Sequence, residues 1–231
     1  MHTVLVPPLL CSSRVFNHLV PVGWSFGSVS IADTRRDASM AGMAQRLLAS
    51  APERFALVGV SMGGYVALEV MRQEPERVAA LGLVCTSARP DTPQDISNRR
   101  RQSELAASGS FDTLVDMAFP GLVTAETESE AALLRLWRAM AHEVGVDAFL
   151  TQQEAVMGRA DSRPLLSEIA CPVAVVHGIG DRLIAPENSE EIAALVPSAR
   201  LTRVPDAGHF VVQQQPAPVG RAVSDLLERV G

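Results

Sequence analysis

Short apolar runs alternate with amphipathic segments over the first 88 residues of the chain. The apolar runs, each of which predicts a buried strand, are 3–6, 28–32, 55–60 and 78–85. The segments between them with helical spacing of apolar positions are 15–19, 40–49 and 65–73. Strands that are apolar on both faces and alternate with helices predict an α/β fold with a mostly parallel, doubly wound sheet.

The alternation stops near Ala88 and returns about eighty residues later. Residues 89–166 are polar and helical in pattern and contain no convincing strand. Strands are expected again at 172–177 and 200–204, with helices at 186–195 and 216–230. We therefore expect one domain, in which 1–88 and 167–231 form the core and 89–166 form an inserted helical lid.

Composition and charge narrow the class of protein. Hydrophobic residues make up 47% of the 231 residues and charged residues 20%, which is ordinary for a globular domain. The net charge of −6 argues against binding to nucleic acid or to an anionic membrane. No apolar stretch is long enough for a membrane span, and the N-terminus lacks the basic and apolar regions of a signal peptide. A cytoplasmic location is the default expectation, and the oligomeric state stays open.

The stretch after the third strand carries the first chemical motif. Gly59-Val60-Ser61-Met62-Gly63 fits G-x-S-x-G, with a strand before it and a helix after it. Strand and helix nearly touch at such a turn, so the residues two before and two after the serine must be small. Ser61 is the candidate nucleophile, raised at the sheet edge where parallel strands end and ligands bind.

Two later loops supply the groups that a serine nucleophile needs. Asp181 follows the strand at 172–177, and His209 follows the strand at 200–204, so both lie at the same sheet edge as Ser61. A histidine can take the serine proton, and a carboxylate can fix the histidine tautomer. Asp206 competes weakly for the role of the acid, and His177 is expected to brace the acid loop.

These motifs together resemble the α/β-hydrolase family over nearly the whole chain. The residues that carry the resemblance are Gly59 to Gly64, His177 to Asp181 and Ala207 to Phe210. The order Ser61, Asp181, His209 is the order of the family's triad. Relatives often begin with a further strand hairpin, so the resemblance implies a sheet about two strands smaller at the N-terminal edge.

The same resemblance implies an oxyanion hole made of two backbone N–H groups. Met62, the residue after the nucleophile, would give one of them. The loop after the first strand is similar to a subgroup with a Pro-Gly-Leu-Leu-Cys loop, with Pro8 in place of the glycine. By that match Leu9 would give the second N–H, with Leu10 as the alternative.

Three functions follow from these residues. The first is a serine hydrolase (carboxylesterase-like) of small ester or related acyl substrates, working through an acyl-enzyme on Ser61, with a substrate pocket in the lid. The second is a carbon–carbon bond hydrolase or lyase, for which an arginine of the run 99–101 would hold a substrate carboxylate, although a solvated basic turn is the simpler interpretation. The third is a non-catalytic ligand-binding protein. The lid residues that could line the pocket are Phe111, Phe119, Trp137 and Met140.

No cofactor or metal is expected from the sequence. His, Asp and Glu do not cluster with ligand spacing, and no glycine-rich phosphate loop follows a strand. The three cysteines, Cys11, Cys85 and Cys171, are far apart and suggest no disulfide framework. The expected partner is a small-molecule substrate.

Overall fold

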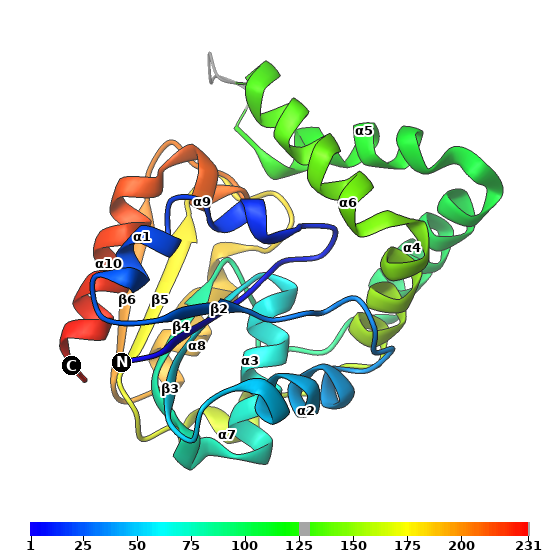
Figure 1. The fold of residues 1–231 in the computed structure, drawn as a ribbon. Coiled ribbons are helices and arrows are strands. Elements are labelled where there is room, and N and C mark those ends of the chain that lie inside the picture. Colours follow the sequence, from blue (N-terminus) through cyan, green and yellow to red (C-terminus); the bar gives the residue numbers. More distant parts are fainter. Residues whose placement is uncertain (125–129, 231) are drawn as a thin grey trace.

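A computed structural model describes residues 1–124 and 130–230. All six strands pair in parallel in one sheet, in the order β2-β1-β3-β4-β5-β6 (Figure 1). The strands are β1 Thr3–Val6, β2 Val29–Ile31, β3 Phe55–Val60, β4 Val78–Val84, β5 Val173–Gly178 and β6 Ala199–Val204. The predicted α/β-hydrolase architecture is confirmed, and each predicted strand lies within one residue of its observed bounds at either end.

Helices cover both faces of the sheet. The helices of this core are α1 Val20–Trp24, α2 Met40–Ser50, α3 Met62–Gln73, α7 Arg163–Leu166, α8 Pro186–Leu195, α9 Val211–Gln214 and α10 Pro216–Glu228. Successive side chains of a strand point to opposite faces, so β3 sends Val58 and Val60 into the core under α10. Its Phe55 and Leu57 pack instead with α2, α3 and α8. Two buried cores thus hold the strands in place.

Some predicted helices have different bounds. The segment predicted as one helix at 15–19 is a 3₁₀ turn at Ser13–Phe16, followed by α1, whose start is favoured by Pro21. A second 3₁₀ turn lies at Pro75–Arg77. The helix after Ser61 begins at Met62 and not at Tyr65, because Gly63 and Gly64 belong to its first turn.

Between β4 and β5 the described residues are helical and contain no strand. The helices are α4 Pro93–Leu105, α5 Phe111–Leu122 and α6 Glu130–Met157, with a π-helical turn at Ala106–Ser110 between α4 and α5. Gly109 and Gly145, at φ 88° and 80°, bend the chain within this segment. Figure 1 shows α4, α5 and α6 gathered on the side of the molecule away from the two termini. We call these three helices the cap.

The cap helices α5 and α6 pack on one another, whereas α4 is polar and buries none of its residues. Trp137 of α6 is 4% exposed, and its indole N–H donates to the carbonyl of Val115 in α5 at 2.8 Å. Among the described residues, none of the helices combines the length and the apolar character that a bilayer span requires.

Candidate active site

Ser61 occupies a sharp turn between β3 and α3. Its backbone has φ 53° and ψ −116°, a conformation that costs a non-glycine residue of order 1–3 kcal/mol. Two hydrogen bonds hold it there: the Ser61 N–H donates to the carbonyl of Val84, and the Thr86 hydroxyl donates to the carbonyl of Ser61, both at 2.8 Å. The neighbouring strand β4 therefore fixes the turn.

Glycine is required on both sides of this turn by close backbone contacts. A Cβ atom at Gly59 would lie 2.2 Å from the carbonyl oxygen of Gly63. One at Gly63 would lie 2.1 Å from the carbonyl oxygen of Val6 in β1. Both distances are far below van der Waals contact, so the spacing of small residues in the motif follows from how tightly β1, β3 and α3 meet.

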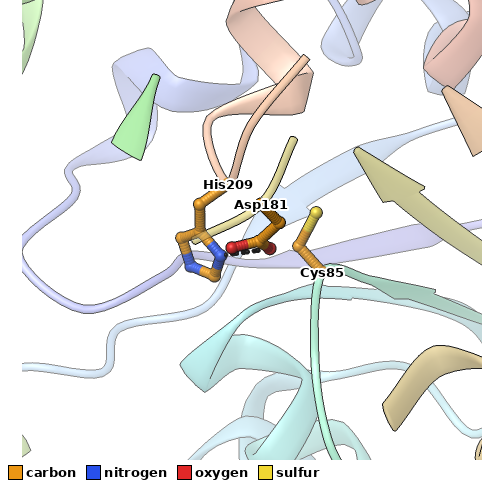
Figure 2. A group of neighbouring side chains, drawn as sticks. All are labelled: Cys85, Asp181 and His209. Carbon is orange, nitrogen blue, oxygen red and sulfur yellow. Dashed lines mark hydrogen bonds and ion pairs between the residues drawn. The ribbon is translucent and has the colours of Figure 1, made fainter. Parts of the chain in front are cut away.

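The structure brings Ser61, His209 and Asp181 into one hydrogen-bonded chain. His209 Nε2 lies 2.8 Å from Ser61 Oγ, and His209 Nδ1 lies 2.8 Å from Asp181 Oδ2 (Figure 2 shows the second contact). A carboxylate only accepts, so Nδ1–H donates to Asp181 and Nε2 is left to accept the Ser61 hydroxyl proton. This tautomer is the one that general-base catalysis by His209 needs.

Asp181 is held as an anion although its side chain is fully buried. Burial by itself raises the pKa of the carboxyl group, but the hydrogen bond from His209 and those from the backbone of Ile184 and Leu183 outweigh it, so the pKa is lowered overall. Oδ1 accepts from the Leu183 and Ile184 N–H groups at 2.8 and 3.0 Å. The loop after β5 thus builds a rigid carboxylate acceptor.

Cys85 lies beside this pair, as Figure 2 shows, whereas the sequence marked it only as one of three widely spaced cysteines. One ligand atom each of Cys85, Asp181 and His209 lies within 4.8 Å of the others, a distance compatible with metal binding. The chemistry argues otherwise: burial, with Asp181 nearby, raises the pKa of the Cys85 thiol well above its usual range, whereas a metal ligand must be a thiolate. Both oxygens of Asp181 are also already used by N–H donors.

The other candidate acid and the second histidine lie elsewhere. Asp206 is exposed, with φ 54°, on the turn before His209. His177, buried at the end of β5, has Nδ1 2.9 Å from Ser189 Oγ and Nε2 3.9 Å from Asp181 Oδ2. Within the part of the chain that the structure describes, this Nε2 has no hydrogen-bond partner. His177 therefore packs behind the acid.

The loop after β1 lies next to Ser61 and forms part of the same cavity wall. Leu10 has φ 58°, and its N–H donates to the side-chain carbonyl of Gln152 in α6 at 3.1 Å. The amide nitrogen of Gln152 donates in turn to the hydroxyl of Thr34, at 3.2 Å. Within residues 1–124 and 130–230, the N–H groups of Leu9 and Met62 have no such acceptor. The sequence analysis did not predict this role of Gln152. No local pattern indicates a contact between two residues that are 142 positions apart in the chain.

A cavity of about 420 Å³ opens over Ser61 and His209. Leu9 and Met62 lie in its wall beside Ser61, and the cap supplies the wall opposite. Of the four lid residues predicted to line it, Trp137 does so. Phe111, Phe119 and Met140 do not line it, because they are packed in the interior of the cap, at 7%, 3% and 0% exposure. The cap residues that line the apolar part are Leu114, Met117, Ala118, Gly121, Leu122, Trp137, Phe149 and Val156.

The three consecutive arginines of α4, residues 99–101, differ in whether they line the cavity. Arg99 lies in the cavity wall and is 21% exposed. Arg100 and Arg101 are exposed and do not line the cavity, although Arg101 donates to the side chain of Asn98, which does. One arginine therefore faces the site, and two belong to the solvated surface.

Comparisons with known proteins agree with this geometry. The family described as the alpha/beta hydrolase fold matches residues 22–216. The chain belongs to the α/β-hydrolase family. Because the match spans the triad motifs and the cap between them, the family relationship covers the site as well as the sheet.

Two of the proteins to which this α/β-hydrolase is similar are named as esterases. It is 28% identical over 203 residues to a pimeloyl-[acyl-carrier protein] methyl ester esterase of Aromatoleum aromaticum, covering 83% of this chain and 81% of that protein. An esterase of Thermogutta terrifontis, with malate bound, superposes with a TM-score of 0.90 at 25% identity, over 100% of this chain and 90% of that one. An enol-lactonase of Burkholderia xenovorans shares the fold, with a TM-score of 0.88 at 21% identity over 98% and 91% of the two chains.

Proposed function

We propose that this α/β-hydrolase cleaves small carboxylic esters or related acyl compounds through a covalent acyl-enzyme on Ser61. The observation that carries the proposal is the continuous chain from Ser61 Oγ through His209 to Asp181, with both contacts at 2.8 Å. The relatives named as a methyl ester esterase and an enol-lactonase support the choice of an acyl–oxygen bond.

In this mechanism Ser61 Oγ attacks the acyl carbon while its proton passes to His209 Nε2. The negative charge that develops on the carbonyl oxygen is stabilised by the N–H groups of Met62 and Leu9. His209 then gives the proton to the leaving alcohol oxygen, and the acyl group stays on Ser61. A water molecule, deprotonated by His209, attacks the acyl-enzyme, and the carboxylic acid is released as Ser61 regains its proton.

The choice of Leu9 over Leu10 as the second oxyanion donor rests on Gln152. The Leu10 N–H is already bound to the Gln152 carbonyl, whereas the Leu9 N–H is available beside Ser61. We further propose that residues 89–166 act as the lid that closes the acyl pocket, since eight residues of the cap line its apolar part.

A carbon–carbon bond hydrolase or lyase using the same triad is the second candidate. It is favoured by Arg99, a cationic side chain in the cavity wall that suits a carboxylate-bearing dienone or keto acid. The hydrogen-bonded triad argues against a purely ligand-binding protein, because such a protein has no need of a general base aligned on a serine.

The test is a pre-steady-state experiment with p-nitrophenyl butyrate. Wild type should release a burst of p-nitrophenol equal to the enzyme concentration, and mass spectrometry should find one butyryl group on Ser61. Ser61→Ala should show neither signal. A folded wild-type protein without burst and without adduct would contradict the ester proposal, and turnover of a dienone or keto acid would then favour the second candidate.

A further inference from the structure

The cavity over Ser61 has one polar wall, and that wall is a single face of α4. The polar cavity residues of this helix are Asp95, Asn98, Arg99 and Gln102, spaced three, four and seven positions apart. This spacing puts them on neighbouring positions of one helical face. The opposite walls of the cavity are apolar, so a bound substrate meets two chemically different ends.

Arg99 is held in this wall by two hydrogen bonds that leave part of its guanidinium unused. Nε donates to Asp91 Oδ2 at 2.6 Å, and Nη1 donates to the side-chain carbonyl of Gln153 at 2.9 Å. Among the described residues, Nη2 donates to no protein group. The side chain is thus fixed in position and still has N–H groups to offer a ligand.

The charges around Arg99 leave a positive surplus. The buried carboxylate of Asp91 is shared by Arg99 and by Arg159, whose Nη1 lies 2.5 Å from Asp91 Oδ1. Two guanidinium groups therefore face one carboxylate. Arg159 is also fixed, with its guanidinium carbon 4.3 Å from the ring centre of Tyr65, another cavity residue.

Asp95 is the acidic residue of the polar wall, and its carboxylate caps the N-terminus of α4. Its carboxylate accepts from the Thr92 N–H and hydroxyl, at 2.9 and 2.7 Å, and so closes a capping box. It is exposed, whereas Asp91 and the two arginines are largely shielded from solvent. Solvent therefore screens the repulsion between Asp95 and a bound anion more than it screens the attraction by the surplus positive charge at Arg99.

We propose that Arg99 forms a subsite for an anionic arm, so that the preferred substrates are esters that also carry a carboxylate. A planar guanidinium fork suits a carboxylate, and the partly desolvated wall strengthens the interaction. The apolar walls then hold the carbon chain between the two functional groups. This inference rests on the ester-cleaving function proposed above and names its substrate class.

The experiment compares two methyl esters of equal chain length, methyl hydrogen glutarate and methyl valerate. The measured quantity is the ratio of their kcat/KM values in wild type, Arg99→Gln and Arg100→Gln. Arg100→Gln is the matched control, because it changes the net charge equally on the solvent side of α4. Wild type and Arg100→Gln should favour the half-ester, and Arg99→Gln should lower the ratio by at least about tenfold, the effect of roughly 1.4 kcal/mol.

A second measurement tests the subsite if the methyl esters are turned over too slowly, or if Arg99→Gln folds poorly. Each methyl ester is added as a competitor of p-nitrophenyl butyrate, and its Ki is measured in wild type and in Gln102→Glu, which adds a negative charge one turn from Arg99. The half-ester should inhibit wild type more strongly than the neutral ester, and Gln102→Glu should remove the difference.

The subsite and the general function fail in different ways. A butyrate burst with no preference of wild type for the half-ester, in either kcat/KM or Ki, would overturn the subsite and leave the esterase proposal intact. An equal drop of the ratio in Arg99→Gln and Arg100→Gln would also overturn it, since long-range charge alone would then be the cause. Absence of both the burst and the butyryl adduct, in a folded wild-type protein, would contradict the esterase function itself.

Discussion

At the scale of single residues, the site depends on backbone conformations that few side chains adopt. Ser61, Leu10, Cys85 and Asp206 all have positive φ without being glycine. Three of them surround the site: Ser61 itself, Leu10 in the loop that faces it, and Cys85 beside the acid. Each is held by packing and hydrogen bonds from other elements, so their cost is met by the surrounding fold.

The assignment of the acid can be tested on two aspartates. Asp181→Asn should lower kcat by about 10⁴-fold, because an amide stabilises neither the His209 tautomer nor the imidazolium that forms. Asp206→Asn is the matched control, since Asp206 is exposed and asparagine tolerates its φ of 54°. Steady-state kinetics on one ester would check both. A large loss in Asp206→Asn, with Asp181→Asn active, would reverse the assignment.

At the scale of elements, one side chain joins the cap to the loop that faces Ser61. Gln152 of α6 is fully buried and bonds both to Leu10 in the loop after β1 and to Thr34 in the loop after β2. Those loops belong to the two adjacent strands at one side of the sheet. The position of α6 and the shape of the proposed oxyanion hole are therefore linked.

Gln152→Met should loosen that link while keeping the volume of the side chain. We expect kcat to fall, by up to about 10²-fold if the Leu9 N–H moves away from the oxyanion, with KM changed much less. The affinity for a boronic acid that forms a tetrahedral adduct with Ser61 should fall in parallel.

Gln153→Met serves as the control for this change, because it removes the neighbouring buried amide. Gln153 bonds to Arg99 and Gln102 and not to the loop. It should alter the choice between charged and neutral esters more than the kcat for neutral ones. Equal effects of the two changes on boronate affinity would count against a specific role of Gln152.

At the scale of the whole molecule, folding buries groups that titrate, so stability should depend on pH. Burial lowers the pKa of His177, although Asp181 opposes this effect, and His209 and Glu187 also face it. The unfolded chain then binds more protons than the folded one below about pH 6.5, the usual histidine value. The stability from His177 is lost as the pH falls from that value through its folded pKa.

Urea unfolding between pH 8 and pH 3 should therefore show two losses of the free energy of unfolding. The first, below about pH 6.5, should shrink in His177→Gln, and the part that remains is expected from His2, whose pKa is also lowered by burial and by the N-terminal charge. The second, below about pH 4, arises from Asp181 and other carboxylates whose pKa is lowered in the fold, and should persist in the variant. A wild-type curve without the first loss would show that His177 is protonated in the folded protein.

Local signals were enough to predict the sheet and the motifs. Each central strand is a short apolar run, and Gly59 reflects a contact with Gly63, four residues along the chain. The spacing of the motif was therefore readable, although Gly63 and Gly64 themselves contact Val6 and Thr86, which are distant in sequence. Because parallel strands end at one edge, chain order alone was sufficient to predict that the loops with Ser61, Asp181 and His209 meet. These features were readable because each depends on spacing within a segment or on a general rule of sheet topology.

Tertiary structure alone decided which side chains face the cavity and which partners they bind. Trp137 and Phe149 line the cavity, whereas Phe111 and Met140, similar in pattern, lie inside the cap. Gln152 reaches Leu10, and Arg99 but not Arg100 enters the wall, through contacts between segments far apart in sequence. Helical periodicity determines that one face is buried, but the rotation and packing of neighbouring helices determine whether that face meets another helix or the open space above the serine.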